Sequence, residues 1–465
     1  MFRWQLMSSV YLTALQLVVM VYLGKLLGYQ QLGVYAVFQI IFRLALALLE
    51  PGMFVSAIQR IELTPRILGR LTRLQFFTGL AGIVLIASFY VIESKYWYEN
   101  SFVAIMALLL FGTIAVGSRY TSMLTRMLRQ RELGIAQISG ATVEFIVILS
   151  LLRTFEPLSI FTVALFIRFF IYYLMAYGYY HRIKTSCFTI SNHEINDEKD
   201  HIRFSSYQMV NQGLSFIQGN FDSVLIISMF GLSVLGPYNL SSELCYLLFS
   251  KINPIFNKAV FPVLARHQQD DLERQDILRE SALSHALVCI SLYVILYVHL
   301  QDLIPMVFQD PEGKVLLFSK FICLMAMIRS VNNFTFNNLL ALGESRNLLR
   351  WNVFILLFNY AFIATIILLK TSVVTFLLIN IFVSLFVLIF SICKLGKYYI
   401  NKQLLVKDIY IYLLCLLTGI TTLFFIRWVS PNVWISFFGG ISSLMFILLI
   451  FYRKKMIRLF QLRIL

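Results

Sequence analysis

Long apolar runs separated by short polar segments follow one another along the whole chain. A helix needs about 20 mostly apolar residues to cross the hydrocarbon core of a bilayer, and about fourteen runs reach that length. They centre near residues 14, 41, 84, 112, 144, 168, 218, 247, 293, 328, 359, 382, 417 and 442. The pattern therefore predicts an all-α polytopic membrane protein with about 14 transmembrane helices.

A spacing pattern occurs twice among these runs, at an offset of 203 residues. The first copy contains Gly28, Gly33, Tyr35 and Pro51, which recur as Gly231, Gly236, Tyr238 and Pro254. Six predicted spans separate the copies, and an even number means that both copies enter the membrane in the same direction. The repeat therefore predicts two parallel-repeat six-helix bundles that face one another, followed by two extra C-terminal helices.

The polar segments between the runs suggest where the bundles begin and end. We expect an N-terminal six-helix bundle at residues 1–180 and a cytoplasmic linker at 181–205. A C-terminal six-helix bundle follows at 206–395, and two extra transmembrane helices with a basic cytoplasmic tail occupy 396–465. Pro51 and Pro254 either kink their helices and act as hinges or simply end them.

Charge supports the membrane assignment and gives its orientation. Apolar residues make up 59% of the chain and charged residues 13%, which excludes an ordinary soluble domain. Most of the 39 Lys and Arg residues fall in alternate loops, so the positive-inside rule predicts that both termini face the cytoplasm. The net charge of +16 then reflects topology and an anionic inner leaflet, and we expect no nucleic-acid partner.

No sequence motif indicates a cofactor. The six cysteines form no C-x-x-C pair, and the six histidines show no metal-ligand spacing. A phosphate-binding G-x-x-x-x-G-K-[ST] loop is also missing from the sequence, so the chain carries no nucleotide-driven motor of its own. We therefore expect neither a bound metal nor a cofactor.

Charged residues deep inside the predicted spans are the first functional candidates. A charge near the bilayer centre costs about 2.5–3.5 kcal/mol even on the lenient insertion scale. The deep cations are Arg43, Arg168, Lys251 and Arg329, and the deep carboxylates are Glu144, Asp222 and Glu243. These side chains either line a wet cavity, where the cations bind anions and the carboxylates take up ions, or form buried ion pairs that hold helices together.

Side-chain amides gather on two predicted spans. The span near residue 218 carries Asn211, Gln212, Gln218 and Asn220, and the span near 328 carries Asn332 and Asn333. An amide offers both donors and an acceptor, which suits sugar hydroxyls, although interhelical hydrogen bonds use the same groups. Tyr172, Tyr173 and Tyr177 could likewise stack on sugar rings.

Short motifs in both bundles resemble those of Wzx-type polysaccharide flippases in the multidrug, oligosaccharidyl-lipid and polysaccharide (MOP) exporter superfamily. The first group runs from Leu26-Leu27-Gly28 through Glu50-Pro51-Gly52 to Ala57-Ile58-Gln59-Arg60. The second group contains Asn220-Phe221-Asp222, Tyr238-Asn239-Leu240 and Phe261-Pro262-Val263-Leu264-Ala265-Arg266. Glu50 stands close to the family's usual aspartate at the end of span 2, so it joins the candidates for ion coupling. The resemblance favours the branch that exports colanic acid, O-antigen, capsule and related exopolysaccharides.

This resemblance implies a function that composition alone does not give. A Wzx-type protein moves an undecaprenyl-pyrophosphate-linked oligosaccharide from the cytoplasmic to the periplasmic leaflet of the bacterial inner membrane by alternating access. The deep cations would then attract the pyrophosphate or acidic sugars, and protons or sodium ions would drive the cycle through the carboxylates. A polysaccharide polymerase and a chain-length regulator are the expected protein partners.

Three other functions stay open at this stage. A cation-coupled multidrug antiporter of the same superfamily would need an acidic cavity, whereas the deep charges lean positive, four to three. A lipid II flippase would share the cationic cavity. A membrane-embedded glycosyltransferase or polymerase would be an enzyme, and we expect none because the external loops are short.

Overall fold

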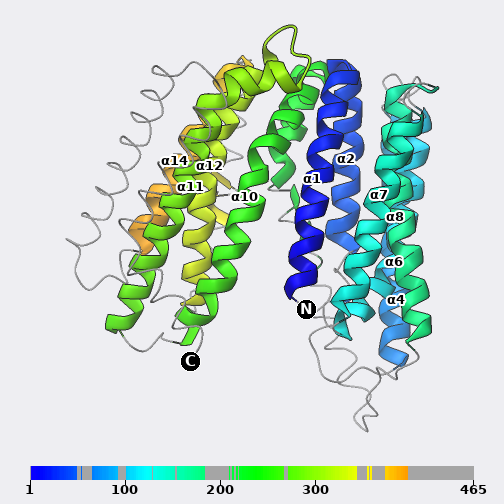
Figure 1. Cartoon of the computed structure of the whole chain (residues 1–465), viewed down its shortest axis with the longest axis horizontal. Helices are drawn as coiled ribbons and strands as arrows, with labels where there is room; N and C mark the ends of the chain where they lie inside the picture. Colours follow the sequence, from blue (N-terminus) through cyan, green and yellow to red (C-terminus); the bar gives the residue numbers. More distant parts are fainter. Residues whose placement is uncertain are drawn as a thin grey trace. The chain divides into compact units, whose positions relative to one another are not determined.

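The computed structural model describes residues 2–49, 54, 65–92, 101–127, 129–151, 154–183, 209, 212–213, 216–217, 219–266, 271–342, 353–355, 357–358 and 372–395. All regular secondary structure in these residues is helical, which confirms the all-α prediction (Figure 1). Eight of the described helices are long and apolar enough to cross a membrane, so the protein is a multi-pass membrane protein. The predicted spans near residues 359, 417 and 442 lie largely or wholly outside the described residues.

The chain divides into two compact units, Met1–Gly236 and Pro237–Leu465. The described part of the first unit contains six long helices: α1 (Phe2–Leu26), α2 (Tyr29–Leu49), α4 (Pro65–Ile92), α6 (Ser101–Arg126), α7 (Gln130–Leu151) and α8 (Pro157–Arg182). α8 packs along both α6 and α7, and α1 also packs along α7. The bundle therefore joins consecutive helices, such as α7 and α8, and helices far apart in the sequence, such as α1 and α7.

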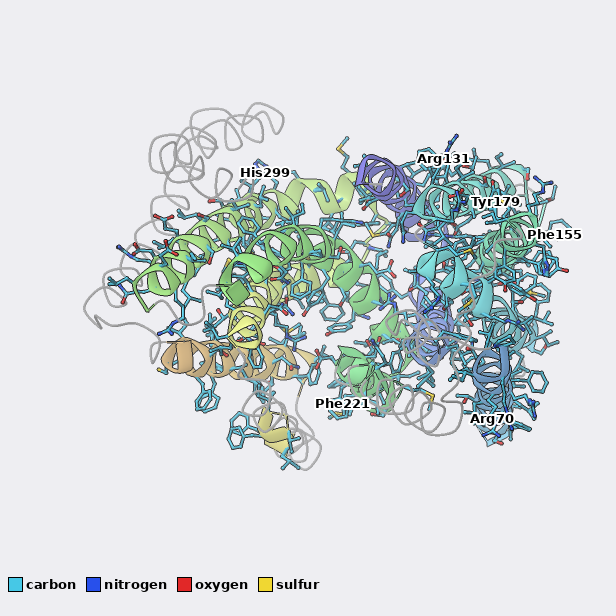
Figure 2. All side chains as sticks on the ribbon, turned by 90° about the horizontal axis from the view of Figure 1, so that it is seen from below. Arg70, Arg131, Phe155, Tyr179, Phe221 and His299 are labelled. Carbon is cyan, nitrogen blue, oxygen red and sulfur yellow. The ribbon has the colours of Figure 1, made fainter. Side chains whose placement is uncertain are left out.

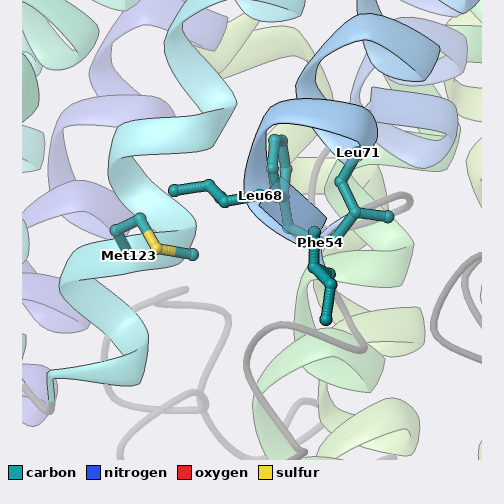
Figure 3. Packing of buried hydrophobic residues seen from close by; sticks show 5 residues of the cluster. Phe54, Leu68, Leu71 and Met123 are labelled. Atoms are coloured by element: carbon teal, nitrogen blue, oxygen red, sulfur yellow. The ribbon is translucent and has the colours of Figure 1, made fainter. Parts of the chain in front are cut away.

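One apolar cluster holds the ends of α4 and α6 together. Phe54, Leu68 and Leu71 are almost fully buried, and Met123 of α6 completes the cluster (Figure 3). All four side chains are 0–1% exposed, so each is surrounded by protein rather than lipid. Close packing of this kind is the main force between helices in a bilayer, because lipid tails are as apolar as leucine.

Gln75 of α4 joins three helices through one buried amide. Its Nε2 atom donates to the carbonyl oxygen of Leu49 at 3.2 Å, to that of Ala115 at 3.2 Å, and to the hydroxyl of Ser118. The residue is 1% exposed. A polar group at this depth needs such partners, since water is not available to replace them.

The outer surface of the first unit is apolar. Phe76 and Phe77 of α4 are 57% and 64% exposed, and Val116 of α6 is 62% exposed. Phe155, in the turn between α7 and α8, is 65% exposed and lies at the outer edge of the unit (Figure 2). Exposed side chains of this kind suit lipid tails and agree with a membrane-spanning bundle.

The second copy of the repeat begins at a glycine whose backbone conformation favours glycine over other residues. Gly231 has φ +79° and lies between the helix at Gly219–Phe230 and α10 (Leu232–Arg266). This left-handed conformation is accessible to glycine without the steric cost that a Cβ atom brings. Its equivalent in the first copy, Gly28, has open space where a Cβ atom would stand.

The other glycines of the repeat lie against one another. A Cβ atom on Gly33 would meet the carbonyl oxygen of Leu232, and one on Gly236 would lie 2.7 Å from the amide nitrogen of Gly33. The start of α10 and the start of α2 therefore approach backbone to backbone. Small residues permit this close approach in membrane helices.

The second unit contains most of α10 with α11 (Asp271–Val307), α12 (Lys314–Ala341) and α14 (Val373–Leu395). α12 lies between α11 and α14, and α10 hydrogen-bonds α12 through Ser241, whose hydroxyl donates to the carbonyl oxygen of Val315 at 3.0 Å. Asp310 caps the start of α12, because its carboxylate accepts from the amides of Val315 and Leu316 at 3.0 and 2.9 Å.

Candidate functional site

The structure brings together two of the predicted charges, Glu144 of α7 and Arg168 of α8. The Nη1 atom of Arg168 donates to the Oε2 atom of Glu144 at 2.9 Å. The Glu144 side chain is 7% exposed, whereas that of Arg168 is 26% exposed. The carboxylate is therefore enclosed, whereas part of the Arg168 side chain reaches the surface of the unit.

Gly140 explains why the two helices come close enough for this pair. It lies one turn before Glu144 on the same face of α7, and a Cβ atom there would stand 2.5 Å from the carbonyl oxygen of Arg168. A side chain at residue 140 would push α8 away. The glycine therefore sets the helix separation at which the ion pair forms.

An aromatic ring of its own helix lies beside the guanidinium of Arg168. Arg168 lies over the ring of Phe169 at 5.4 Å, and that ring packs against Phe42 of α2 with 4.5 Å between ring centroids. Arg43, the next residue on α2, is half-buried. The Phe42–Phe169 contact thus brings the helices that carry Arg43 and Arg168 side by side, so an anion near α8 would also experience the charge of Arg43.

The predicted tyrosines of α8 divide into buried and accessible groups. Tyr172 and Tyr173 are 7% and 3% exposed, and Gly117 of α6 packs against the ring of Tyr173. Tyr177 is 46% exposed and meets Tyr120 of α6 edge to face at 5.0 Å. Of these three tyrosines, Tyr177 is therefore the one with a ring accessible for stacking on a sugar.

Arg329 is the corresponding cation of the second unit. It lies on α12, where its Nη1 atom donates to the hydroxyl of Tyr246 at 2.9 Å and its Nε atom to the hydroxyl of Ser384 at 3.3 Å. These partners come from α10 and α14, so the guanidinium ties three helices together. Both of these hydroxyl groups are neutral, so neither cancels the positive charge of Arg329.

The amides of α12 bind neighbouring helices. Asn332 accepts from the hydroxyl of Ser391 on α14 at 2.7 Å. Asn333 accepts from Nδ2 of Asn253 on α10 at 3.3 Å and from Asn337 on its own helix at 3.1 Å. In this conformation both amides serve interhelical packing, which is one of the two roles their sequence pattern allows.

The remaining candidates occupy more scattered positions. Lys251 and Glu243 are half-buried on α10, Asp222 is half-buried on the Gly219–Phe230 helix, and Gln212 is half-buried. Asn220 donates to the carbonyl oxygen of Phe216 within its own helix at 3.0 Å. Pro254 is exposed in the middle of α10, whose helix continues past it. Glu50, Pro51, Asn211 and Gln218 lie outside the described residues.

Sequence reasoning missed a buried polar cluster in the second unit, centred on Asn253 and including His285 and Ser330. Asn253 precedes Pro254 in a span whose prediction emphasised the proline, and His285 stands alone in an apolar run. The signal available was a single histidine within a predicted span, which is an ionisable group in a membrane. Among the described residues no group of three or more His, Cys, Asp or Glu could hold a metal ion.

Comparison of the sequence with known families and proteins gives consistent matches. The family model described as "Polysaccharide biosynthesis protein" matches residues 22–311. The "Lipopolysaccharide biosynthesis protein WzxC" of Escherichia coli strain K12 is 22% identical over 359 residues, which cover 76% of this chain and 71% of that protein. The "Teichuronic acid biosynthesis protein TuaB" of Bacillus subtilis strain 168 is 23% identical over 361 residues, with 76% and 73% covered.

Solved structures show the same fold at lower sequence identity. The inward closed conformation of the lipid II flippase MurJ superposes with a TM-score of 0.71 at 13% identity, covering 97% of this chain and 99% of that one. An inward-facing multidrug transporter of the MATE family superposes with a TM-score of 0.58 at 14% identity, covering 83% and 95%. Similarity at this identity shows a shared fold, and the substrate has to be argued from the site.

Proposed function

This chain belongs to the polysaccharide biosynthesis protein family, as a Wzx-type flippase of the MOP superfamily, and we propose that its substrate is an oligosaccharide linked to undecaprenyl pyrophosphate. The protein moves this O-antigen, capsule or exopolysaccharide repeat unit from the cytoplasmic to the periplasmic leaflet of the bacterial inner membrane by alternating access. Both termini face the cytoplasm, as the distribution of Lys and Arg indicates. The names of WzxC and TuaB, which refer to lipopolysaccharide and teichuronic acid biosynthesis, support a glycan substrate.

The observation that carries this proposal is the partly exposed side chain of Arg168 inside a membrane-spanning bundle. A cation there costs free energy unless it is paired or serves a function. Its Nη1 atom donates to Glu144 at 2.9 Å, and the side chain as a whole is 26% exposed, so the other N–H groups of the guanidinium are the proposed donors to a phosphate oxygen. Within the first unit, Arg43 on the neighbouring α2 adds to the positive potential that an anionic pyrophosphate requires. Lys251 and Arg329 are the cations proposed for the same role within the second unit.

Ion coupling follows from the same pair. While Glu144 is ionised, it competes with the substrate for Arg168. Once the carboxylate binds a proton or a sodium ion, its attraction to Arg168 weakens, and the guanidinium can bind the pyrophosphate. Asp222, Glu243 and Glu50 are the other carboxylates proposed for this exchange. The sugars are bound by side-chain amides, including Gln212 and Asn220, and by the accessible ring of Tyr177.

One transport experiment tests the proposed substrate and distinguishes this function from the alternative functions. Purified protein is reconstituted in liposomes with a fluorescent undecaprenyl-pyrophosphate oligosaccharide, and movement is measured as glycan that becomes protected from an external quencher. Movement of an unchanged glycan supports a flippase. Elongation or cleavage of the glycan would instead indicate a membrane-embedded glycosyltransferase or polymerase, and transport of lipid II or of cationic drugs in its place would indicate the other branches of the superfamily.

Variants connect the measured movement to the site. Arg168→Gln is expected to lower the rate by about tenfold or more, since a hydrogen bond to a charged group contributes about 1.5–3 kcal/mol. Arg129→Gln is the matched control, because the Arg129 side chain is 48% exposed and pairs with Glu132 at 3.6 Å near the start of α7. Equal rates for Arg168→Gln, Arg43→Gln and wild type would contradict the cationic site. Co-purification of a polymerase and a chain-length regulator from cells tests the proposed partners.

A further inference from the structure

Three helices of the second unit meet at one buried amide. The Oδ1 atom of Asn253 on α10 accepts from the Ser330 hydroxyl on α12 at 2.7 Å and lies 2.8 Å from Nε2 of His285 on α11. Its Nδ2 atom donates to the carbonyl oxygen of Ser330 and to Asn333 Oδ1, both at 3.3 Å. Asn253, His285 and Ser330 are 2%, 0% and 0% exposed, so the cluster is closed to lipid and water alike.

The partners of Asn253 assign the protonation state of the imidazole. The carbonyl oxygen of Ser330 only accepts, so the amide must present its NH₂ group to that side and its oxygen to His285. Nε2 of His285 therefore carries the proton and donates it to Asn253. Nδ1 then bears the lone pair, and it is buried without a hydrogen-bond partner.

Aromatic rings hold the imidazole in this position. Phe334 of α12 stacks on His285 with 4.3 Å between ring centroids and 13° between planes, and Phe256 of α10 meets the imidazole edge to face at 5.1 Å. The ring is thus fixed by contacts from two helices while its basic nitrogen remains unused. Nδ1 can stay buried without a partner while the imidazole is neutral. A second N–H group at Nδ1 would be a buried donor without an acceptor, which is unfavourable.

We propose that His285 is a proton-binding site of the second unit, and that proton uptake at Nδ1 opens the junction of α10, α11 and α12. Protonation creates a second N–H donor and a positive charge, and the closed cluster offers neither an acceptor nor water to them. The charged form is therefore stable only in a conformation that lets water or an anion reach Nδ1. By linkage, acidification favours that conformation.

The helices around the cluster carry few charges near it in sequence. α11 itself carries Glu280 and the Cys289 thiol on either side of His285. α10 contributes Lys251, and α12 contributes Arg329, whose guanidinium is directed to Tyr246 and Ser384. α14, which packs on α12, carries a single charge, Lys394, in its last turn. Burial away from water is therefore what opposes a positive charge in the closed cluster.

A weak point in α10 lies directly beside the cluster. Pro254 follows Asn253, and a proline has no N–H group to donate to the carbonyl oxygen four residues earlier, at Ser250. α10 can therefore bend here at lower cost than elsewhere along its length. Breaking the hydrogen bond between Asn253 and His285 would allow α10 to bend at Pro254. Proton uptake and helix movement would therefore occur at the same place in the fold.

This inference deepens the proposed function, on which its meaning depends: a proton becomes the coupling ion, and the second unit becomes the place where it binds. The proton binding itself does not require that the substrate is a glycan. It can therefore be measured on the purified full-length protein without any substrate.

Cys289 reports on the opening of the cluster. It lies one turn after His285, hydrogen-bonds Ser330 and is 0% exposed, whereas Cys393 near the end of α14 is exposed. The full-length protein is treated with N-ethylmaleimide at about pH 8 and about pH 5.5, a range that spans the usual titration of histidine. Mass spectrometry gives the labelling of Cys289 relative to Cys393, which removes the intrinsic pH dependence of the reagent.

The expected result is a relative Cys289 labelling that rises about tenfold on acidification, since a minor open state of roughly 1% would become substantially populated. His285→Gln keeps a donor for Asn253 but cannot be protonated, so its labelling should stay at the pH 8 level. His299→Gln is the matched control, because His299 is a second buried histidine of α11 and is 2% exposed. Its variant should respond as wild type. Figure 2 labels the position of His299. An unchanged response in His285→Gln, or a flat wild-type response, would overturn the proposal.

A second measurement needs no variant. In protein labelled with ¹⁵N-histidine, one imidazole should keep the neutral Nε2–H form at about pH 8 and become imidazolium over the range in which Cys289 becomes reactive. If every buried imidazole stays neutral down to about pH 5.5, the proposal fails. Failure of the glycan assignment would look different, because lipid-linked oligosaccharide would not move while the Cys289 response remained.

Discussion

Gly33 and Gly236, which occupy equivalent positions in the two copies of the repeat, touch in the folded protein. A Cβ atom on Gly236 would lie 2.7 Å from the Gly33 amide nitrogen and would also meet the carbonyl oxygen of Tyr29. A flexible side chain can change its rotamer to relieve a clash, whereas these backbone atoms cannot move without shifting a helix. The spacing pattern thus marks a place where two helices approach as closely as their backbones allow.

Adding one methyl group at either glycine should therefore destabilise the protein. Gly33→Ala and Gly236→Ala are each expected to lower the free energy of unfolding by about 1–3 kcal/mol, as overpacking commonly does. Thermal unfolding in detergent measures the change. Gly28→Ala adds the same methyl group where nothing lies within 4 Å, and it should be close to neutral. A loss in Gly28→Ala equal to that in Gly33→Ala would refute the steric explanation.

Separating Glu144 from Arg168 should cost more than removing both charges. Arg168→Gln leaves a buried carboxylate without its cation, and losing one partner of a buried pair costs about 3–5 kcal/mol. The double variant Glu144→Gln/Arg168→Gln retains side-chain amides and should recover much of that loss. A double-mutant cycle on the unfolding free energy gives the coupling directly. Strict additivity of the two single variants would show that the 2.9 Å contact contributes nothing to stability.

The phenol of Tyr246 should contribute to stability through Arg329. Tyr246→Phe removes the oxygen that the guanidinium donates to at 2.9 Å and changes little else. We expect a loss of about 0.6–1.7 kcal/mol, the range measured for interhelical hydrogen bonds in a membrane protein. Tyr297→Phe on α11 serves as the control for loss of a phenolic oxygen, because its hydroxyl has no hydrogen-bond partner among the residues that the structure describes. Similar melting temperatures for both variants would contradict this role.

Gln75 should be replaceable only by another residue with an amide donor. Gln75→Met fills a similar volume but leaves the carbonyl oxygens of Leu49 and Ala115 without their side-chain donor. Three lost contacts are expected to lower the unfolding free energy by about 1–2 kcal/mol in total. Gln130→Met, at the first residue of α7, tests the same substitution at a helix end. Folding yields and thermal midpoints measure the effect, and Gln75→Met should lower both more than Gln130→Met does.

Periodic and compositional features made most of the fold predictable. The apolar runs predicted helices near residues 14, 112, 144 and 168, and helices span all four positions. Bilayer thickness explains this success, because a run of that length has few other stable conformations in lipid. The different roles of Gly28 and Gly231, the first glycines of the two copies, could not be predicted from the sequence. Gly231 has a positive φ, whereas Gly28 does not.

The site was predictable in its residues but not in its pairings. Depth in a span marked Glu144 and Arg168 as candidates, yet their contact depends on Gly140 and on the rotation of α7 against α8, which no residue pattern specifies. His285 went unnoticed because its importance comes from Asn253 and Ser330, which lie 32 and 45 residues away in sequence. Partners of that kind are visible only after the helices have packed.

The short separation along the chain between Glu144 and Arg168, 24 residues, bears on how the protein is made. α7 and α8 are consecutive helices, so they can enter the bilayer together as a hairpin in which the carboxylate and the guanidinium are already neutralising one another. Asn253 differs, because its partners Ser330 and Asn333 are synthesised 77 and 80 residues later. His285 on α11 is synthesised 32 residues after Asn253, so the amide of Asn253 gains its partners in steps, first when α11 packs against α10 and then when α12 does.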